Sequence, residues 1–229
     1  MYIDAHHHLW NFDPVEYDWI DDSMSLLQRD FLVKDLEKTL NTNGFSASVA
    51  VQARQSMEET LWLLSLAEST NLIKGVVGWI DLKSDNLAQQ LDELSGYKKL
   101  VGFRHVIQGE TDPAFMQHPD FIRGLTLLAD RGYRYDLLIL AHQLPAAAEM
   151  LAKVPHLSVV IDHIAKPDIK DKTDFEQWKT GMAILANNPS CYCKLSGMVT
   201  EADWSNWTDA DFQPYMKTVW ELFGDERIM

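Results

Sequence analysis

The chain has 229 residues, of which 46% are hydrophobic and 24% charged, a composition typical of a folded globular domain. Its 34 acidic and 20 basic residues give a formal net charge of −14, which argues against a nucleic-acid partner because phosphate binding needs a basic surface. The sequence contains no apolar run of transmembrane length, and Asp4 and three histidines interrupt the N-terminus where a signal peptide would be apolar. We therefore expect neither a nucleic-acid nor a membrane partner.

A histidine triplet lies inside the apolar segment that opens the chain, between Ile3 and Trp10. Side chains alternate between the two faces of a strand, so His6 and His8 share one face while His7 points to the other. Two adjacent imidazoles can hold a divalent metal or transfer protons to and from a substrate. The spacing therefore predicts a functional pair, His6 and His8.

Short β-rich runs alternate with helical segments along the whole chain. The predicted strands cover residues 2–8, 46–52, 74–80, 100–107, 133–140, 157–163 and 191–195. The predicted helices cover about 33–41, 56–71, 84–94, 118–130, 144–153, 174–187 and 211–223. Ser56 and Glu59 have the spacing of a capping box, which predicts that the second helix begins at Ser56.

The strands are nearly continuous apolar runs, which is typical of a parallel sheet buried on both faces. Strand–helix alternation of this kind predicts an α/β fold, here a single (β/α)8 TIM-barrel domain over residues 1–229. A dinucleotide-binding sheet is disfavoured because no Gly-x-Gly-x-x-Gly follows the first strand. Only Gly224–Met229 follow the last predicted helix, so we expect the eighth strand to begin there and to be truncated.

Polar side chains gather where the predicted strands end, and active sites of such barrels lie at these C-terminal ends. Arg104 and His105 alternate, and Arg104 is the one we expect to face the interior and clamp an oxygen of the substrate. The predicted catalytic residues are His6, His8, Arg104 and His163. The predicted substrate-binding residues are Trp10, Gln52, Trp79 and His105.

Other residues near the strand ends carry weaker signals. Asp162 is expected to act or to orient a neighbouring ring. Cys191 and Cys193 would lie on one face of one strand, so we expect them to be buried packing residues in a reducing, cytoplasmic compartment. The long segment Asn11–Phe31 follows the first strand and is rich in aromatic and acidic residues. It is either a lid with a part in specificity or a packed surface loop anchored by its own aromatics.

Four segments together carry a resemblance to a known family: Ile3–Trp10, Gly102–Val106, Val160–Pro167 and Lys194–Gly197. They resemble the signatures of the amidohydrolase-related TIM-barrel family, and most of all its sugar-acid lactonase branch, which includes L-fuconolactonases and L-rhamnonolactonases. The resemblance implies hydrolysis of a small aldonolactone to its hydroxy acid, with His6, His8 and His163 in the polar centre. It also implies an aspartate on the eighth strand, beyond Met229.

One divalent metal, with zinc as the first choice, could be held by His6, His8 and His163 and leave a position open for chemistry. Metal-independent hydrolysis stays open, since a lactone is more reactive than an amide. The alternatives are metal-dependent amide hydrolysis or decarboxylation on the same scaffold, or a catalytically inactive binding protein. The expected partner is a small lactone, and a homo-oligomer stays open.

Overall fold

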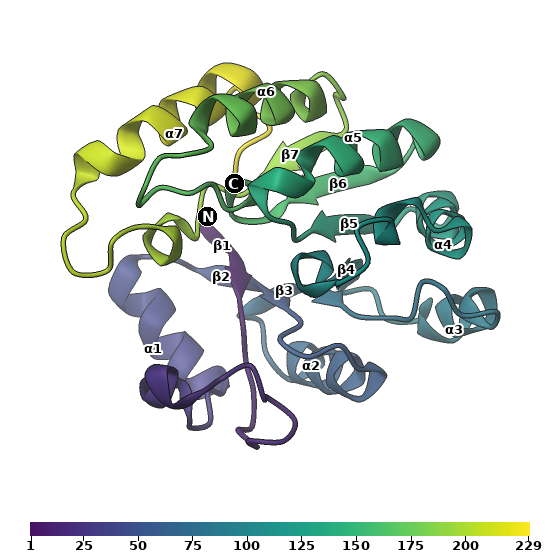
Figure 1. Ribbon diagram of the computed structural model, residues 1–229. Coiled ribbons are helices and arrows are strands. Elements are labelled where there is room, and N and C mark those ends of the chain that lie inside the picture. Colours follow the sequence, from purple (N-terminus) through teal and green to yellow (C-terminus); the bar gives the residue numbers. More distant parts are fainter. The chain divides into compact units, whose positions relative to one another are not determined.

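The computed structural model describes all 229 residues, and strands alternate with helices throughout (Figure 1). The strands are β1 (Ile3–His7), β2 (Ala47–Val51), β3 (Ile73–Gly78), β4 (Leu100–His105), β5 (Arg134–Leu137), β6 (Ser158–Ile161) and β7 (Cys191–Cys193). The α-helices are α1 (Val33–Asn43), α2 (Met57–Ser69), α3 (Leu87–Leu94), α4 (Pro119–Asp130), α5 (Leu144–Lys153), α6 (Phe175–Ala186) and α7 (Asp209–Phe223). No helix combines the length and the apolar character needed to cross a bilayer.

The chain divides into two compact units. The N-terminal unit comprises residues 1–81 and 88–104, and the C-terminal unit comprises residues 82–87 and 105–229. Both units repeat the strand–helix alternation that the sequence predicts, so the α/β fold class is confirmed. Every predicted strand and helix is present, and most differ from the prediction by a few residues at their ends.

In the N-terminal unit, β1, β2, β3 and β4 pair in this order and all run parallel. Helices α1 and α2 lie on one side of β1–β3 (Figure 1). Helix α2 buries Leu63, Leu64 and Ala67 against this sheet. Gly78 lets the end of β3 approach α2 closely, because a Cβ atom there would lie 2.5 Å from Cγ2 of Thr60. Because the four strands are parallel, their C-terminal ends lie at the same edge of the sheet.

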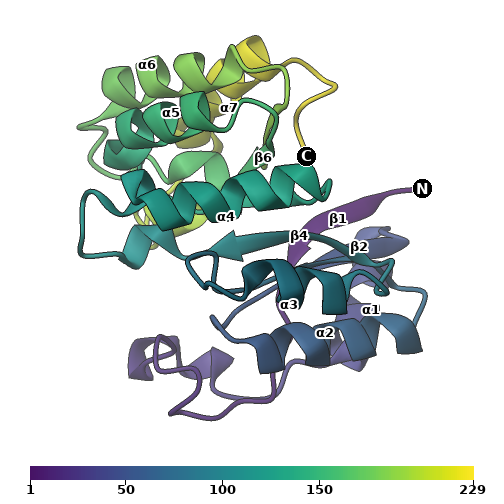
Figure 2. The same ribbon diagram turned by 90° about the vertical axis from the view of Figure 1, so that its right-hand side faces the viewer.

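In the C-terminal unit, β5, β6 and β7 pair in this order and are also parallel. Helices α5, α6 and α7 lie side by side (Figure 2). The largest fully buried side chains of this unit are aromatic and include Trp178, Tyr135, Tyr215 and Phe121. Trp178 and Tyr215 contact each other with ring centroids 5.1 Å apart, which ties α6 to α7.

The last residues of the chain add a further parallel pairing to β7. The Cys193 N–H donates to the carbonyl of Arg227 at 2.9 Å, and the Met229 N–H donates back to Cys193 at 3.0 Å. Ile228 forms a parallel bridge with Cys193. An eighth strand thus begins where the sequence predicts it. The order and the pairing of the elements are those of the first seven strands of a (β/α)8 barrel.

The predicted capping box is only half right. Ser56 Oγ accepts from the Glu59 N–H at 3.1 Å, as expected for the start of α2. The Glu59 carboxylate does not return to the Ser56 N–H, because that group already donates to the Arg54 carbonyl at 3.0 Å. Glu59 instead accepts from the backbone N–H groups of Ala53 and Arg54.

Candidate active site

The two outer histidines of the triplet meet, as the strand alternation predicts. The Nε2 atoms of His6 and His8 lie 3.1 Å apart. His8 Nδ1 lies 2.8 Å from the carbonyl oxygen of Val51, which can only accept, so Nδ1 carries the proton and Nε2 of the neutral ring carries the lone pair. Burial, with smaller contributions from His6 and Arg104, lowers the pKa of His8 well below its ordinary value. His8 is therefore a neutral imidazole, the form that accepts a proton or binds a metal.

Arg104 joins this pair from β4. Its side chain is buried, Nη1 lies 3.4 Å from Nε2 of His6, and Nη2 donates to the backbone carbonyl of Gln52. The Gln52 side chain is fully buried and its Nε2 donates back to the Arg104 carbonyl at 3.4 Å. The ends of β1, β2 and β4 thus bring together four of the predicted residues, a guanidinium, an amide and two imidazoles.

The side chain of His7 lies on the other face of β1. It lines a cavity of about 430 Å³ together with Leu36, Thr39 and Asn43 of α1. Burial lowers the pKa of His7 to about 4, and the charge of Asp4 and the Val49 carbonyl only partly offset this effect. His7 is thus a neutral side chain between strand and helix; His8 also lines this cavity, but the ring of His7 takes no part in the His6–His8 contact.

His163 lies in the C-terminal unit, in a turn of unusual backbone conformation. His163, Ile164, Ala165 and Lys166 have φ values of 52°, 51°, 58° and 46°, all in the left-handed region that residues other than glycine rarely adopt. Each such residue costs on the order of 1 kcal/mol, so the surrounding structure must hold the turn in place. Backbone strain of this kind concentrates at functional sites.

Neighbouring groups fix the orientation of the His163 ring. Its Nδ1 lies 2.9 Å from Oγ of Ser196, so Nε2 is the nitrogen directed away from that hydroxyl. Gly197 packs against the same ring: a Cβ atom at this position would lie 2.7 Å from both Cβ and Cγ of His163. The hydrogen bond at Nδ1 and the tight packing together set the direction of the ring.

A buried ion cluster joins the ends of β5, β6 and β7. Lys194 Nζ lies 2.5 Å from Oδ2 of Asp136 and 2.8 Å from Oδ1 of Asp162, and all three side chains are at most 4% exposed. Burial lowers the pKa of Lys194, but the two carboxylates outweigh burial and the pKa lies above its ordinary value. Asp162, the residue before His163, therefore pairs with Lys194. Sequence reasoning missed Asp136, whose signal is a lone charge inside an apolar strand.

The remaining predicted substrate-binding residues lie in three different settings. The Trp10 indole is buried, and its Nε1 donates to the carbonyl of Arg29 at 2.8 Å. The backbone N–H of Trp79 donates to Oγ1 of Thr60 at 2.8 Å. The His105 ring stacks on Phe115 with centroids 4.8 Å apart. A role in substrate binding stays a prediction for all three.

The segment Asn11–Phe31 packs around aromatic residues of its own. Trp10, Tyr17 and Ile20 form a buried cluster, and Trp10 and Phe31 exchange two backbone hydrogen bonds that hold the ends of the segment together. These features are those of a packed surface loop. Its predicted part in specificity stays a prediction.

The two cysteines are free and fully buried on β7. Burial raises the pKa of Cys191 to about 12 and that of Cys193 well above its ordinary value. Both are therefore thiols, whereas metals bind thiolates. Their predicted role in packing is confirmed.

The amidohydrolase family profile matches residues 3–229. The chain belongs to the amidohydrolase family. It is 38% identical to L-fucono-1,5-lactonase of Burkholderia multivorans over 99% of this chain and 79% of the relative, and 33% identical to L-fucono-1,5-lactonase of Burkholderia ambifaria over 99% and 78%. A crystal structure of an amidohydrolase from Burkholderia multivorans with bound zinc matches 100% of this chain and 82% of that chain, with 37% identity and a TM-score of 0.94.

The histidine pair suits a divalent metal. Zinc binds imidazole nitrogens at about 2.0–2.1 Å, and two nitrogens 3.1 Å apart can both lie at that distance from one ion. His8 is already in the neutral form that a metal needs, and its Nδ1 bond to Val51 fixes the tautomer that presents Nε2. The residues of the N-terminal unit therefore fit a metal site of the kind expected in an amidohydrolase.

Proposed function

We propose that the chain hydrolyses the lactone of a small sugar acid to the open hydroxy acid. The observation that carries this proposal is the convergence of His6, His8, Arg104 and Gln52 at the ends of three strands, in a chain similar over 99% of its length to L-fucono-1,5-lactonases. Opening a lactone needs a base for water, a donor for the carbonyl oxygen and a proton for the leaving alkoxide.

The residues supply these functions as follows. The neutral His8 imidazole accepts the proton of the attacking water through Nε2, since Nδ1 is committed to Val51. The Arg104 guanidinium, beside His6, donates to the oxygen on which negative charge develops. The imidazolium formed at His8 then returns its proton to the leaving alkoxide. Gln52 holds Arg104 through two hydrogen bonds and keeps its guanidinium in place.

The metal-dependent alternative to this proton transfer is a single divalent ion, zinc in first place, held by His6 and His8 with His163 as the proposed third ligand. An ion on Nε2 of His8 would take the lone pair that the base uses, because Nδ1 is committed to Val51. When bound, such an ion would supply Lewis acidity toward the carbonyl and make water more acidic. The ring orientation set by Ser196 and Gly197 supports the choice of His163. Trp10, Gln52, Trp79 and His105 are proposed to contribute to substrate binding.

A panel of aldonolactones tests the proposed function. L-Fucono-1,5-lactone and its stereoisomers, in five- and six-membered forms, are assayed by proton release with and without added zinc. We expect turnover of at least one of these lactones. Absence of turnover on every sugar lactone, with zinc present and folding verified, would reject the proposal.

Two variants from the same triplet test the site. His8→Ala should lose lactone hydrolysis by at least about 100-fold, as expected for removal of an acid–base residue. His7→Ala is the matched control, because His7 lies next in sequence but takes no part in the His6–His8 contact, and it should retain activity. Full activity of His8→Ala would refute the assignment.

A further inference from the structure

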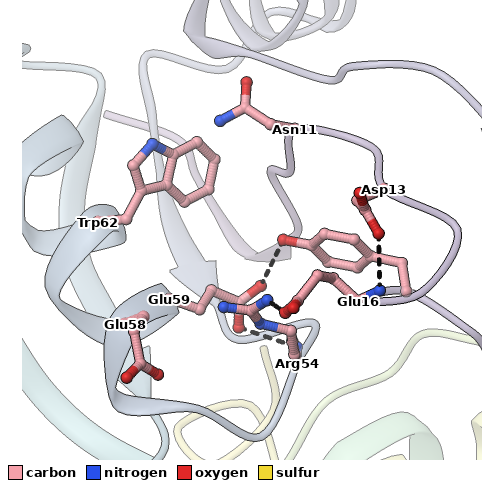
Figure 3. Close-up of a pocket in the computed structure, with 8 residues that line it drawn as sticks. Asn11, Asp13, Glu16, Arg54, Glu58, Glu59 and Trp62 are labelled. Carbon is pink, nitrogen blue, oxygen red and sulfur yellow. Dashed lines mark hydrogen bonds and ion pairs between the residues drawn. The ribbon is translucent and has the colours of Figure 1, made fainter.

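Two loops that leave the candidate active site meet at one buried carboxylate. Glu59 lies in the first turn of α2 and is 3% exposed. One of its oxygens, Oε2, accepts from the backbone N–H groups of Ala53 at 3.0 Å and Arg54 at 2.8 Å. The other, Oε1, accepts from the Tyr17 hydroxyl at 3.3 Å (Figure 3). Glu59 thereby connects the loop after β1 with the loop after β2.

Both loops begin at residues of the site. Ala53 and Arg54 directly follow Gln52, whose carbonyl accepts from Arg104. Tyr17 belongs to the segment Asn11–Phe31, which starts three residues after His8. A displacement of Ala53 or Arg54 would therefore be transmitted to Gln52 through one or two peptide units.

A second contact reinforces the first. The Arg54 guanidinium forms an ion pair with Glu16, the residue before Tyr17, so neighbouring residues of the two loops interact twice (Figure 3). A cavity of about 240 Å³ lies beside these contacts and is lined by Asn11, Trp62 and the interacting side chains. On the side of the cavity the segment is held by these polar contacts, in addition to the apolar cluster of Trp10, Tyr17 and Ile20.

The groups around Glu59 need a buried polar side chain at this position. Two backbone N–H groups and the Tyr17 hydroxyl converge on one buried point, and an apolar side chain there would leave all three without a partner. Burial raises the pKa of Glu59 to about 7, while the hydrogen bonds from Arg54, Ala53 and Tyr17 and the charge of Arg54 act in the opposite direction. The other acidic groups of this cavity are Asp13, Glu16 and Glu58.

We propose that Glu59 is a positioning residue for the lactonase site: its carboxylate fixes the loop after β2, and with it Gln52 and Arg104, and fastens the segment Asn11–Phe31 over the same strand ends. The proposal rests on the proposed function for its kinetic part, whereas its structural part concerns the loops alone. Glu59 acts through Gln52 and Arg104 and does not itself contact the reacting atoms.

The test combines amide hydrogen exchange with lactone kinetics in the full chain. Glu59→Ala should speed exchange in residues 11–31 and 52–56 and lower kcat/KM by about 10- to 100-fold, as expected when catalytic groups shift by a fraction of an ångström to 1 Å. Glu59→Gln can still accept both N–H bonds with its amide oxygen and donate to Tyr17 with its NH2 group. It should therefore keep the slow exchange and stay within about threefold of the original kcat/KM.

Glu58→Ala is the matched control. This neighbouring carboxylate lines the same cavity but is exposed, and it points away from the contacts of Glu59 (Figure 3). It should leave both exchange and kinetics unchanged. Equal effects of Glu58→Ala and Glu59→Ala, or original exchange and kinetics in Glu59→Ala, would overturn the proposal.

Tyr17→Phe keeps the proposal testable if Glu59→Ala does not fold. It removes one hydroxyl and should speed exchange in residues 11–31 while leaving residues 52–56 protected. Unchanged exchange in residues 11–31 would overturn the proposal. If the unmodified chain turns over no lactone, the proposed function fails, yet the exchange measurements still decide whether Glu59 fixes the two loops.

Discussion

The indole Nε1 of Trp178 donates to the backbone carbonyl oxygen of Ile164 at 2.7 Å, and both side chains are fully buried. Ile164 is the second of four successive left-handed residues, between His163 and Lys166. A further backbone bond runs from the Ile164 N–H to the Lys194 carbonyl at 3.2 Å. The strained turn that carries His163 is thus held by α6 and by Lys194, the residue that follows β7.

Replacing Trp178 by Phe should therefore weaken both the fold and the site. The change leaves a buried carbonyl without its donor, which costs about 2 kcal/mol of unfolding free energy, measurable by urea denaturation. Relaxation of the turn should also lower kcat/KM for the lactone. Tyr215→Phe is the control, because it removes a hydrogen bond to the Asp168 carbonyl from a ring that contacts Trp178. If both variants reduce activity equally, the effect of Trp178 is not specific to the turn.

Gly197→Ala should reduce activity by displacing His163. Gly197 has φ +68° and ψ 5°, and an added Cβ would lie 2.7 Å from His163 Cβ and Cγ. Gly44→Ala separates the backbone cost from the contact, since Gly44 has φ 75° and ψ 18° but no atom within 4 Å of such a Cβ. Gly44→Ala should lose about 1 kcal/mol of stability from the backbone alone, and Gly197→Ala should lose more because of the added contact, as measured by thermal or urea unfolding. Only Gly197→Ala should lose lactone hydrolysis and zinc affinity, and equal losses in Gly44→Ala would contradict this account.

Residue periodicity was sufficient to predict how the histidines and Arg104 are arranged at the strand ends of the N-terminal unit. The two-residue period of a strand places His6 with His8 and separates His7 from them, and it turns Arg104 and His105 in opposite directions. The order of strands and helices could also be predicted, from apolar runs and helix caps. The predicted ends of the elements differ from the observed ends by a few residues.

Other features depend on residues that are distant in sequence or on backbone geometry without a sequence signal. Lys194 and Asp136 are 58 residues apart, and nothing in either segment marks the other as its partner. The left-handed turn at His163–Lys166 contains no glycine or asparagine that would indicate it. Glu59 has the spacing of a capping box, but its carboxylate turns to Ala53 and Arg54 because the Ser56 N–H is already bound.

Lys194→Met should destabilise the chain strongly and in a pH-dependent way. Without the ammonium group, Asp136 and Asp162 face each other as buried, uncompensated carboxylates, a change that costs about 3–5 kcal/mol. Their folded-state pKa values would then rise above the unfolded values, so the lost stability should be smaller at pH 5 than at pH 8. Urea denaturation at both pH values measures the difference.

Lys172→Met provides the comparison for that experiment. Lys172 forms an ion pair with Asp211 at 2.7 Å, but its side chain is 53% exposed. An exposed pair contributes at most about 1 kcal/mol, so this variant should lie close to the original chain at both pH values. A loss in Lys194→Met no greater than that in Lys172→Met would show that the buried cluster is not a structural requirement.

Glu59 should make the chain less stable as the pH rises through neutrality. Its pKa is raised from 4.5 to about 7 by burial, so between these values the folded state keeps a proton that the unfolded state has released. That contribution is fully present below about pH 4.5 and is lost as the pH rises through 7, a change of about 3 kcal/mol. Glu59→Gln has no such titration, and its unfolding free energy relative to the original chain should increase between pH 5 and pH 7 and level off by pH 8. Urea denaturation at four pH values measures this slope, with the exposed Glu58→Gln as the reference. Parallel stability curves for Glu59→Gln and the original chain would mean that Glu59 is charged throughout this range, with its three hydrogen bonds compensating for burial.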